Sequence, residues 1–91
     1  MAIKLTGHIV VPKNDVPMIE AEMENHIANT QAEPGCQVFR IEKISNQFGH
    51  YSVYEIFNDQ SAFDHHQQRV RESKWGRITQ NVERHYVIEE L

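Results

Sequence analysis

Alternating apolar and polar residues predict four β-strands along the chain. In the first, residues 3–11, the apolar side chains fall on one side and Lys4, Thr6 and His8 on the other, which is the period of a strand buried mainly on one face. Residues 45–49 have the composition of a turn, so the strands on either side of them are expected to form a hairpin. The three later strands are predicted at residues 37–44, 50–58 and 83–90.

Helical spacing of apolar residues predicts helices in the two long intervals between these strands. The first helix starts near residue 16, ends before Glu33, and carries an apolar stripe made of Val16, Ile19, Met23, Ile27 and Thr30. His26 lies beside this stripe and is expected to be a partly buried structural residue. The second helix follows a cap at Asn58 or Asp59, and Ser73 starts a further helical piece. Its inward side is predicted to contain Ala62, Phe63, His66 and Val70.

The order of these elements predicts an α+β fold, the ferredoxin-like β-α-β-β-α-β arrangement with a four-stranded antiparallel sheet and helices on one face. No linker or repeat divides the chain, so residues 1–91 are expected to form a single domain. In the third strand Glu55 shares a face with Val53, and Tyr54 and Ile56 lie on the other face. Because both faces carry large apolar side chains, we expect a second subunit to cover the open one.

Composition limits the partners and the compartment. The formal net charge is −4, which disfavours nucleic acid because phosphate binding needs clustered Lys and Arg. No apolar run approaches the roughly 18 residues of a membrane span, so no membrane partner is expected. Cys36 is the one cysteine, and the N-terminus has no secretory pattern. Both features favour a cytoplasmic location.

Three motifs occur in order along the chain: Glu33-Pro34-Gly35-Cys36 after a helix, Tyr54-Glu55-x-Phe57 in a strand, and Ala62-x-x-x-His66 in the next helix. In this order and at these separations they resemble the antibiotic biosynthesis monooxygenase family of small α+β proteins. The resemblance covers nearly the whole chain. It implies a homodimer, a dimeric α+β barrel in which two sheets pack face to face, with a pocket in each subunit between its sheet and its helices.

The resemblance also implies an activity, the oxidation of an electron-rich aromatic compound such as a quinol or polyphenol by dioxygen without a cofactor. His66 is the candidate catalytic residue, because its helical position turns it toward the sheet whereas His65 is rotated about 100° away. An imidazole with an ordinary pKa of about 6.5 can take a proton from an acidic phenol or hydrogen-bond a substrate oxygen. Glu55 can orient His66 or bind a substrate hydroxyl, and a structural ion pair is the alternative for it.

Aromatic side chains are expected to complete the substrate pocket. The candidates are Phe57 and Phe63 at the junction of strand and helix, Trp75 as a wall, and one of Tyr51, Tyr54 and Tyr86 from the sheet. Gly7 interrupts an apolar row, which marks either a close approach by a ligand or ordinary packing. The spacing of the histidines predicts no metal site, and the chain has no glycine-rich phosphate loop, so no metal or cofactor is expected.

Other functions remain open at this level. Relatives that isomerise or degrade small carbonyl compounds without oxygen suggest a second enzymatic hypothesis. Haem degradation is disfavoured, because Gly7 or His8 stands where that branch of the family carries asparagine and His66 where it carries tryptophan. A non-enzymatic ligand-binding dimer is the hypothesis from a different class, since a fold does not determine a function. A cavity with no room beside His66 would favour this last hypothesis.

Overall fold

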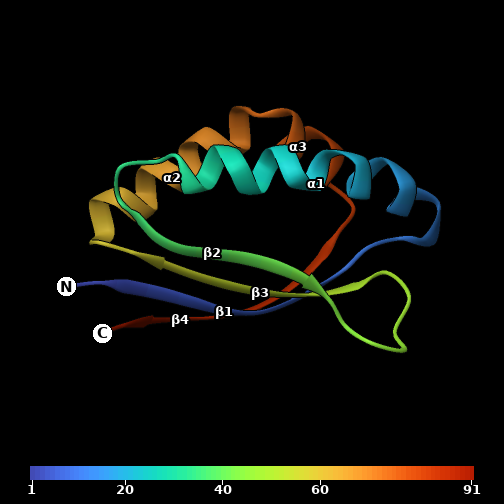
Figure 1. Cartoon of the computed structure of the whole chain (residues 1–91), viewed down its shortest axis with the longest axis horizontal. Coiled ribbons are helices and arrows are strands. Elements are labelled where there is room, and N and C mark those ends of the chain that lie inside the picture. Colours follow the sequence, from blue (N-terminus) through green and yellow to red (C-terminus); the bar gives the residue numbers. More distant parts are fainter.

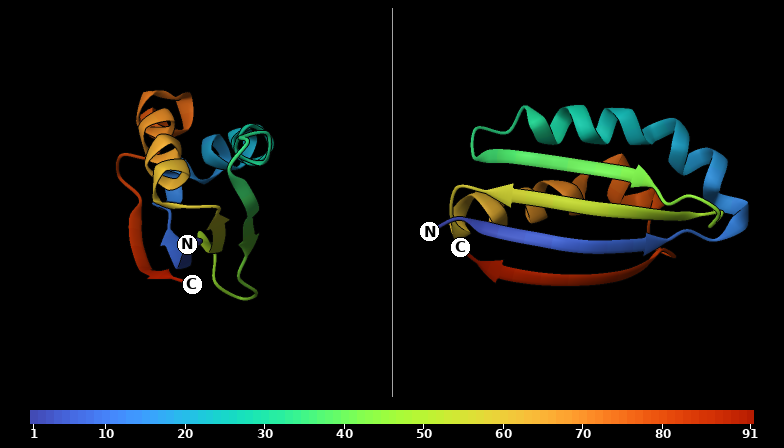
Figure 2. Two further views of the ribbon diagram at one scale, coloured as in Figure 1. Left: turned by 90° about the vertical axis from the view of Figure 1, so that its left-hand side faces the viewer. Right: turned by 60° about the horizontal axis from the view of Figure 1, so that its bottom comes forward.

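The four predicted strands form one antiparallel sheet in the order β2-β3-β1-β4. The computed structural model describes all residues, 1–91. Its strands are β1 (Ile3–Val10), β2 (Cys36–Lys43), β3 (His50–Phe57) and β4 (Glu83–Glu90). Neighbouring β1 and β3 occupy the centre, and β2 and β4 are the edges (Figure 2). The predicted ferredoxin-like topology is confirmed, with strand boundaries within one residue of the predicted ones.

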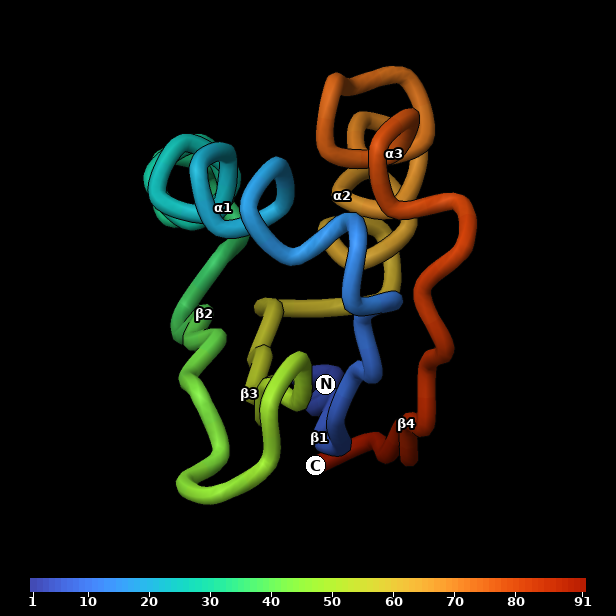
Figure 3. The backbone as a smooth tube through the Cα atoms, turned by 90° about the vertical axis from the view of Figure 1, so that its right-hand side faces the viewer, coloured from blue at the N-terminus to red at the C-terminus, as the bar shows by residue number.

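All helices lie on one face of this sheet (Figures 1 and 3). They are the short 3-10 helix η1 (Lys13–Asp15), α1 (Val16–Gln31), α2 (Gln60–Glu72) and α3 (Lys74–Ile78). The side chain of Asp59 caps α2 by accepting a hydrogen bond from the amide of Ala62 at 2.8 Å. Ser73 ends α2 and caps α3 in the same way, accepting from the amide of Gly76. Both caps were predicted from the sequence.

The core lies between the sheet and the helices. It consists of alternate side chains from the two central strands and the inward side chains of the helices, together with Val11 and Val82. The burial of α1 differs from the prediction in one respect: His26 is buried, whereas Met23 and Ile27 are only partly so. The helix is therefore rotated so that an imidazole, not an aliphatic side chain, faces the sheet at this level.

No element of the chain covers the opposite face of the sheet (Figure 1). This face presents alternate residues of each strand, among them Tyr54 and Ile56 of β3 and Val87 of β4. Val87 is 59% exposed, and all residues of β4 are exposed. No helix of the fold is long and apolar enough to cross a membrane.

At Gly7 the backbones of β1 and β4 approach each other closely. It pairs with Val53 and Tyr86 in the centre of the sheet and has a φ of 156°. A Cβ atom at this position would lie 1.9 Å from the carbonyl oxygen of His85. The glycine therefore allows β4 to dock on β1, which is the packing alternative considered for it.

Alanine at position 7 should lower the free energy of unfolding by about 2 kcal/mol or more, because β1 and β4 would have to separate locally. Chemical denaturation of Gly7→Ala tests this expectation. The neighbouring Thr6→Ala, on the uncovered face, serves as a control that should cost less than about 1 kcal/mol. Equal stability of wild type and Gly7→Ala would contradict the steric argument.

Candidate functional site

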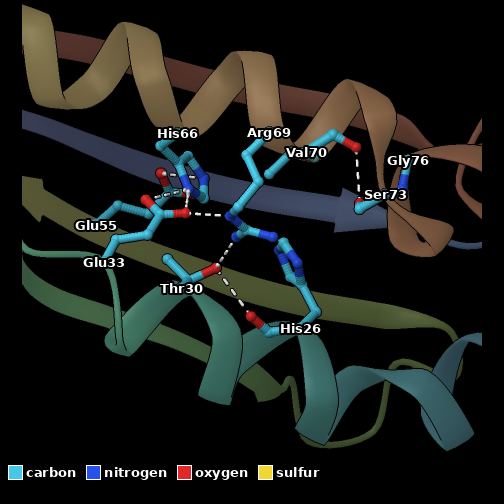
Figure 4. Close-up of polar contacts among 9 residues, drawn as sticks. All are labelled: His26, Thr30, Glu33, Glu55, His66, Arg69, Val70, Ser73 and Gly76. Atoms are coloured by element: carbon cyan, nitrogen blue, oxygen red, sulfur yellow. Dashed lines mark hydrogen bonds and ion pairs between the residues drawn. The ribbon is translucent and has the colours of Figure 1, made fainter.

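A buried imidazole lies between two buried carboxylates beneath the helices (Figure 4). His66 comes from α2, Glu55 from β3, and Glu33 from the turn that follows α1. The Nδ1 atom of His66 is 3.2 Å from both carboxylate oxygens of Glu33. Its Nε2 atom faces Oε1 of Glu55 at 3.8 Å. The imidazole thus has one hydrogen-bonded side and one side separated from a carboxyl group by a short gap.

Glu33 is held in turn by α2 and α1. The Nε atom of Arg69 donates a hydrogen bond to Oε2 of Glu33, and its Nη2 atom donates to the hydroxyl of Thr30 at 3.0 Å. That hydroxyl donates to the carbonyl of His26 at 2.8 Å. These contacts form a continuous polar chain from α1 to the imidazole (Figure 4). The chain fixes the carboxylate that contacts Nδ1.

Glu55 has an unusual charge state for an acid. Burial, and secondarily the nearby negative charge of Glu33, raise the pKa of Glu55 from 4.5 to about 8. Its Oε1 atom is buried and has no hydrogen-bond partner. A buried polar atom without a partner is costly and is a mark of a functional position. The side chain is therefore a neutral carboxylic acid at neutral pH, with unused hydrogen-bonding capacity.

His66 is neutral as well. Burial lowers its pKa below 6.5, and the adjacent Glu33 opposes this shift without cancelling it. With Glu33 ionised, the neutral imidazole carries its proton on Nδ1 and donates it to Glu33. The lone pair of Nε2 then points toward Glu55. This is the arrangement of a general base that is oriented by a carboxylate.

A small cavity lies beside Glu55, between the sheet and the helices. Its volume is about 30 Å³, which is room for about one water molecule. His66 does not border it. The lining residues are Ile9, His26, Phe39, Ile41, Val53, Glu55, Trp75, Thr79, Val82, Arg84 and Tyr86. The polar part of this wall comes from α1, from β3, from β4 and from the end of α3.

Trp75 forms one wall of this cavity together with His26. Their rings stack with centroids 4.5 Å apart and an interplanar angle of 1°, and the rings of His26 and Phe39 form a T-shaped contact with centroids 5.2 Å apart. Burial lowers the pKa of His26 from 6.5 to about 3. The imidazole of His26 is therefore an uncharged aromatic surface over the physiological pH range.

The structure brings together three of the predicted site residues, Glu55, His66 and Trp75, and places the others elsewhere. Phe57 and Phe63 are buried core residues in edge contact, with centroids 5.8 Å apart, and do not border the cavity. Tyr54 lies on the uncovered face of the sheet, where Lys4 and Arg40 approach its ring. The alternation of β3 excludes it from the cavity. Gly7 does not border the cavity either.

Tyr86 borders the cavity and was one of three tyrosines considered for it, whereas sequence reasoning missed the other contributors, which are Glu33, Arg69, Arg84 and His26 as a cavity wall. Glu33 lay in a motif that was interpreted as a helix end and turn. Arg69 was interpreted as part of a solvated basic helix face. One signal was available for it, because Arg69 follows His66 by three residues and so lies on the same side of α2. The sequence around Glu33 contains no signal that its side chain would reach His66 and Arg69.

A larger open groove, about 620 Å³ in volume, borders the loop between β2 and β3. Its ionisable side chains are already paired. Glu20 accepts a hydrogen bond from the hydroxyl of Tyr51 at 2.5 Å and lies 3.3 Å from Nζ of Lys43. The groove therefore offers less for chemistry than the small cavity. No cluster of three or more His, Cys, Asp or Glu side chains is arranged to hold a metal ion.

Comparison with known proteins gives one family match and several similar solved structures. A family model described as antibiotic biosynthesis monooxygenase matches residues 4–75 of the chain. No curated protein sequence matches significantly. Among solved structures, a protein of unknown function from Bacteroides thetaiotaomicron, described as a possible oxidoreductase, superposes with a TM-score of 0.83 at 15% identity, covering 99% of this chain and 97% of that one.

Two further solved structures are candidate antibiotic biosynthesis monooxygenases. The one from Nitrosomonas europaea has a TM-score of 0.78 at 15% identity, covering 99% of this chain and 97% of that one. The one from Caulobacter crescentus has a TM-score of 0.71 at 21% identity, with coverages of 97% and 85%. At these identities the structural likeness establishes the fold, and the family model establishes the family.

Proposed function

The chain belongs to the antibiotic biosynthesis monooxygenase family, and on this premise we propose that it is a cofactor-independent monooxygenase acting on an electron-rich aromatic compound, a quinol or polyphenol. The observation that carries the proposal is the buried pair of Glu55 and His66, with an unpartnered acid oxygen. Such a pair serves to remove a proton from a phenol, which is the step that prepares the substrate for dioxygen.

The overall reaction converts a phenol and dioxygen into a quinone and water. Loss of the phenol proton to the site gives an anion, which passes one electron to dioxygen. The two resulting radicals combine to form a carbon–oxygen bond. One oxygen atom stays on the ring as the new carbonyl, and the other leaves as water with the ring hydrogen and the phenol proton. The substrate supplies all the electrons, so no cofactor takes part.

The cavity must widen before a ring can enter, because it has room for about one water molecule. The stacked pair of Trp75 and His26 borders it on the side of the helices, and Arg84 and Tyr86 border it on the side of β4. Tyr86 is 37% exposed, so this side is close to solvent. We propose that substrate enters here, since the side chains of an exposed edge strand move at lower cost than the core.

The small volume also favours a second candidate function, a non-enzymatic ligand-binding protein. The cavity beside Glu55 does not reach His66. A protein that only binds a ligand needs no access to the imidazole. The two functions differ in whether substitutions at the polar pair change a rate or only an affinity.

We further propose a homodimer in which a second copy of the chain covers the open sheet face. Support comes from the apolar groups on that face, Ile56 and Val87, and from the exposure of β4. A small domain also gains stability from burying such a face. The lone, half-buried Cys36 supports the proposal of a reducing, cytoplasmic environment.

Oxygen uptake with a panel of hydroquinones and polyphenols tests the monooxygenase. His66→Gln should lower the rate at least about 100-fold, the usual contribution of a positioned acid or base. His65→Gln, an exposed neighbour on α2, is the matched control and should retain the wild-type rate. Equal rates in wild type and His66→Gln, or turnover that persists without oxygen, would contradict the proposal.

A further inference from the structure

We propose that Glu55, and not His66, is the residue that contacts the substrate hydroxyl, and that His66 receives the substrate proton through Glu55. This inference rests on the proposed function, because it places a phenolic substrate in the cavity beside Glu55. It assigns different roles to the two residues. Glu55 is the catalytic residue that contacts the substrate, His66 accepts the proton behind it, and Glu33 and Arg69 are positioning residues.

Access to the imidazole is the first argument. Aromatic rings pack against His66 on two sides, with centroid distances of 5.6 Å to Phe39 and 4.7 Å to Phe57. Glu33 occupies the Nδ1 side. The Nε2 atom faces Glu55, which is the member of the pair that borders the cavity. A ligand in the cavity therefore meets the carboxyl group of Glu55 before it can reach His66.

The gap between the pair is the second argument. Oε1 of Glu55 and Nε2 of His66 are 3.8 Å apart, which is too far for a direct hydrogen bond. Oε1 has no other partner. The gap closes only when one of the two side chains moves toward the other. The site is thus arranged so that a hydrogen bond between the two side chains forms only when something shifts Glu55 toward His66.

The proton step balances within the site. A substrate hydroxyl gives its proton to one oxygen of the Glu55 carboxyl group while the proton already on that group moves to Nε2 of His66. The substrate O–H bond breaks, one Glu55 O–H bond forms and another breaks, and an N–H bond forms. Glu55 is neutral before and after. The products are a substrate anion in the cavity and an imidazolium beside Glu33.

The surrounding charges fit this transfer. Before it, the charges of Glu33 and Arg69 compensate each other, and the pair is neutral because burial raises the pKa of Glu55 and lowers that of His66. After it, the imidazolium lies against the Glu33 carboxylate and balances the substrate anion. The other titratable or charged groups near the pair are His26 on α1, Cys36 on β2, His65 on α2, and Arg84 and Tyr86 on β4.

These other groups do not compete for the proton at neutral pH. Burial lowers the pKa of His26 to about 3 and raises that of Cys36, and partial burial of Tyr86 raises its pKa to about 12. Each of them keeps its neutral form while the substrate ionises. His65 is exposed and turned away. The pair of Glu55 and His66 therefore contains the acceptor whose protonation changes in the relevant range.

Binding of para-nitrophenol tests the inference without any turnover, because only its ionised form absorbs visible light. Wild-type protein should bind the probe as the anion at about pH 6. Glu55→Gln, which keeps size and hydrogen bonding but passes no proton, should lower the anion absorbance about tenfold or more. Glu24→Gln, an exposed acid-to-amide change on α1, is the matched control. Thermal melting confirms that each variant is folded.

A second variant separates positioning from structure. In Glu33→Gln the imidazolium loses its counter-charge, so the pH midpoint for ionisation of the bound probe should rise by about one unit or more relative to wild type. A purely structural role for Glu33 would change affinity and leave the midpoint where it is. That result would overturn the positioning role.

The possible results with the probe distinguish failure of this inference from failure of the proposed oxidation. Ionisation of the probe by Glu55→Gln to the wild-type extent would overturn the inference and point to direct contact with His66. Failure of wild-type protein to bind and ionise the probe would overturn it as well. Ionisation that depends on Glu55, in a protein that takes up no oxygen with any quinol, would support the inference while the proposed oxidation failed.

Discussion

Replacing Glu55 by glutamine should raise the free energy of unfolding by roughly 3 to 5 kcal/mol at about pH 9, although it removes the proposed catalytic group. In the folded protein the pKa of Glu55 is raised from 4.5 to about 8. Between these two values the unfolded chain releases the proton and the folded chain retains it. The contribution of Glu55 to the free energy of unfolding is thus fully present below pH 4.5, and it is lost as the pH rises through 8.

Denaturant titrations of wild type and Glu55→Gln at a series of pH values measure this effect. The two stability curves should meet near pH 4, where both side chains are neutral, and separate progressively up to about pH 8. Glu24→Gln on the surface of α1 should follow the wild-type curve throughout. Parallel curves for wild type and Glu55→Gln would show that the carboxyl group ionises normally in the folded protein.

His26→Phe should protect the protein against acid. Burial lowers the pKa of His26 from 6.5 to about 3. Between these two pH values the imidazole is protonated in the unfolded chain and stays neutral in the folded protein. Wild-type stability from this group is present above pH 6.5 and is lost as the pH falls toward 3. Phenylalanine keeps the ring stacked on Trp75 and does not titrate. The variant should therefore gain roughly 2 to 4 kcal/mol over wild type at about pH 4.

The control for this effect is His65→Phe, which replaces an exposed imidazole on α2. It should leave unchanged the acid limb of the stability curve, that is, the decrease in the free energy of unfolding as the pH falls below about 6.5. Some acid sensitivity should remain in His26→Phe, because burial also lowers the pKa of His66. Unfolding midpoints measured between about pH 3 and pH 7 provide the comparison. An acid limb in His26→Phe as steep as that of wild type would contradict the assignment.

These two effects describe a site that is maintained at a cost in stability. A buried acid keeps its proton well above its ordinary pKa, a buried imidazole stays unprotonated well below its ordinary pKa, and an acid oxygen has no partner. Substitutions that stabilise a protein while impairing its activity are a known mark of functional sites. The joint result, greater alkaline stability with loss of probe ionisation in Glu55→Gln, would be hard to explain by a structural role.

Local sequence signals predicted the elements closely. The side chains of Asp59 and Ser73 cap helices where their sequence positions indicated, and β4 runs over the predicted residues. His66 is buried and His65 exposed, as helical spacing required. These features depend on contacts within a few residues, or on the repeat of two residues in a strand and 3.6 residues in a helix. Both can be recognised from the sequence alone.

The candidate site was predicted less completely. Glu55 and Trp75 border the small cavity and His66 lies next to Glu55, whereas Tyr54, one of three tyrosines considered for the pocket, is turned to the other face of the sheet by its strand position. Phe57 and Phe63 fill the core. Their aromatic character was compatible with a hollow or a filled interior, and packing density alone distinguishes these outcomes.

The sequence by itself determined the order of elements, the inward side of α2 and of the strands, and the pairing of β2 with β3 through a short turn. Tertiary structure alone decided that Glu33 reaches His66 across 33 positions of chain, that Arg69 holds Glu33, and that Glu55 rather than His66 borders the cavity. The physical reason is that the face on which a side chain lies follows from the repeat of its helix or strand, which can be counted along the sequence. A proton path depends instead on distances between side chains, and these are set by the packing of α1 and α2 on the sheet.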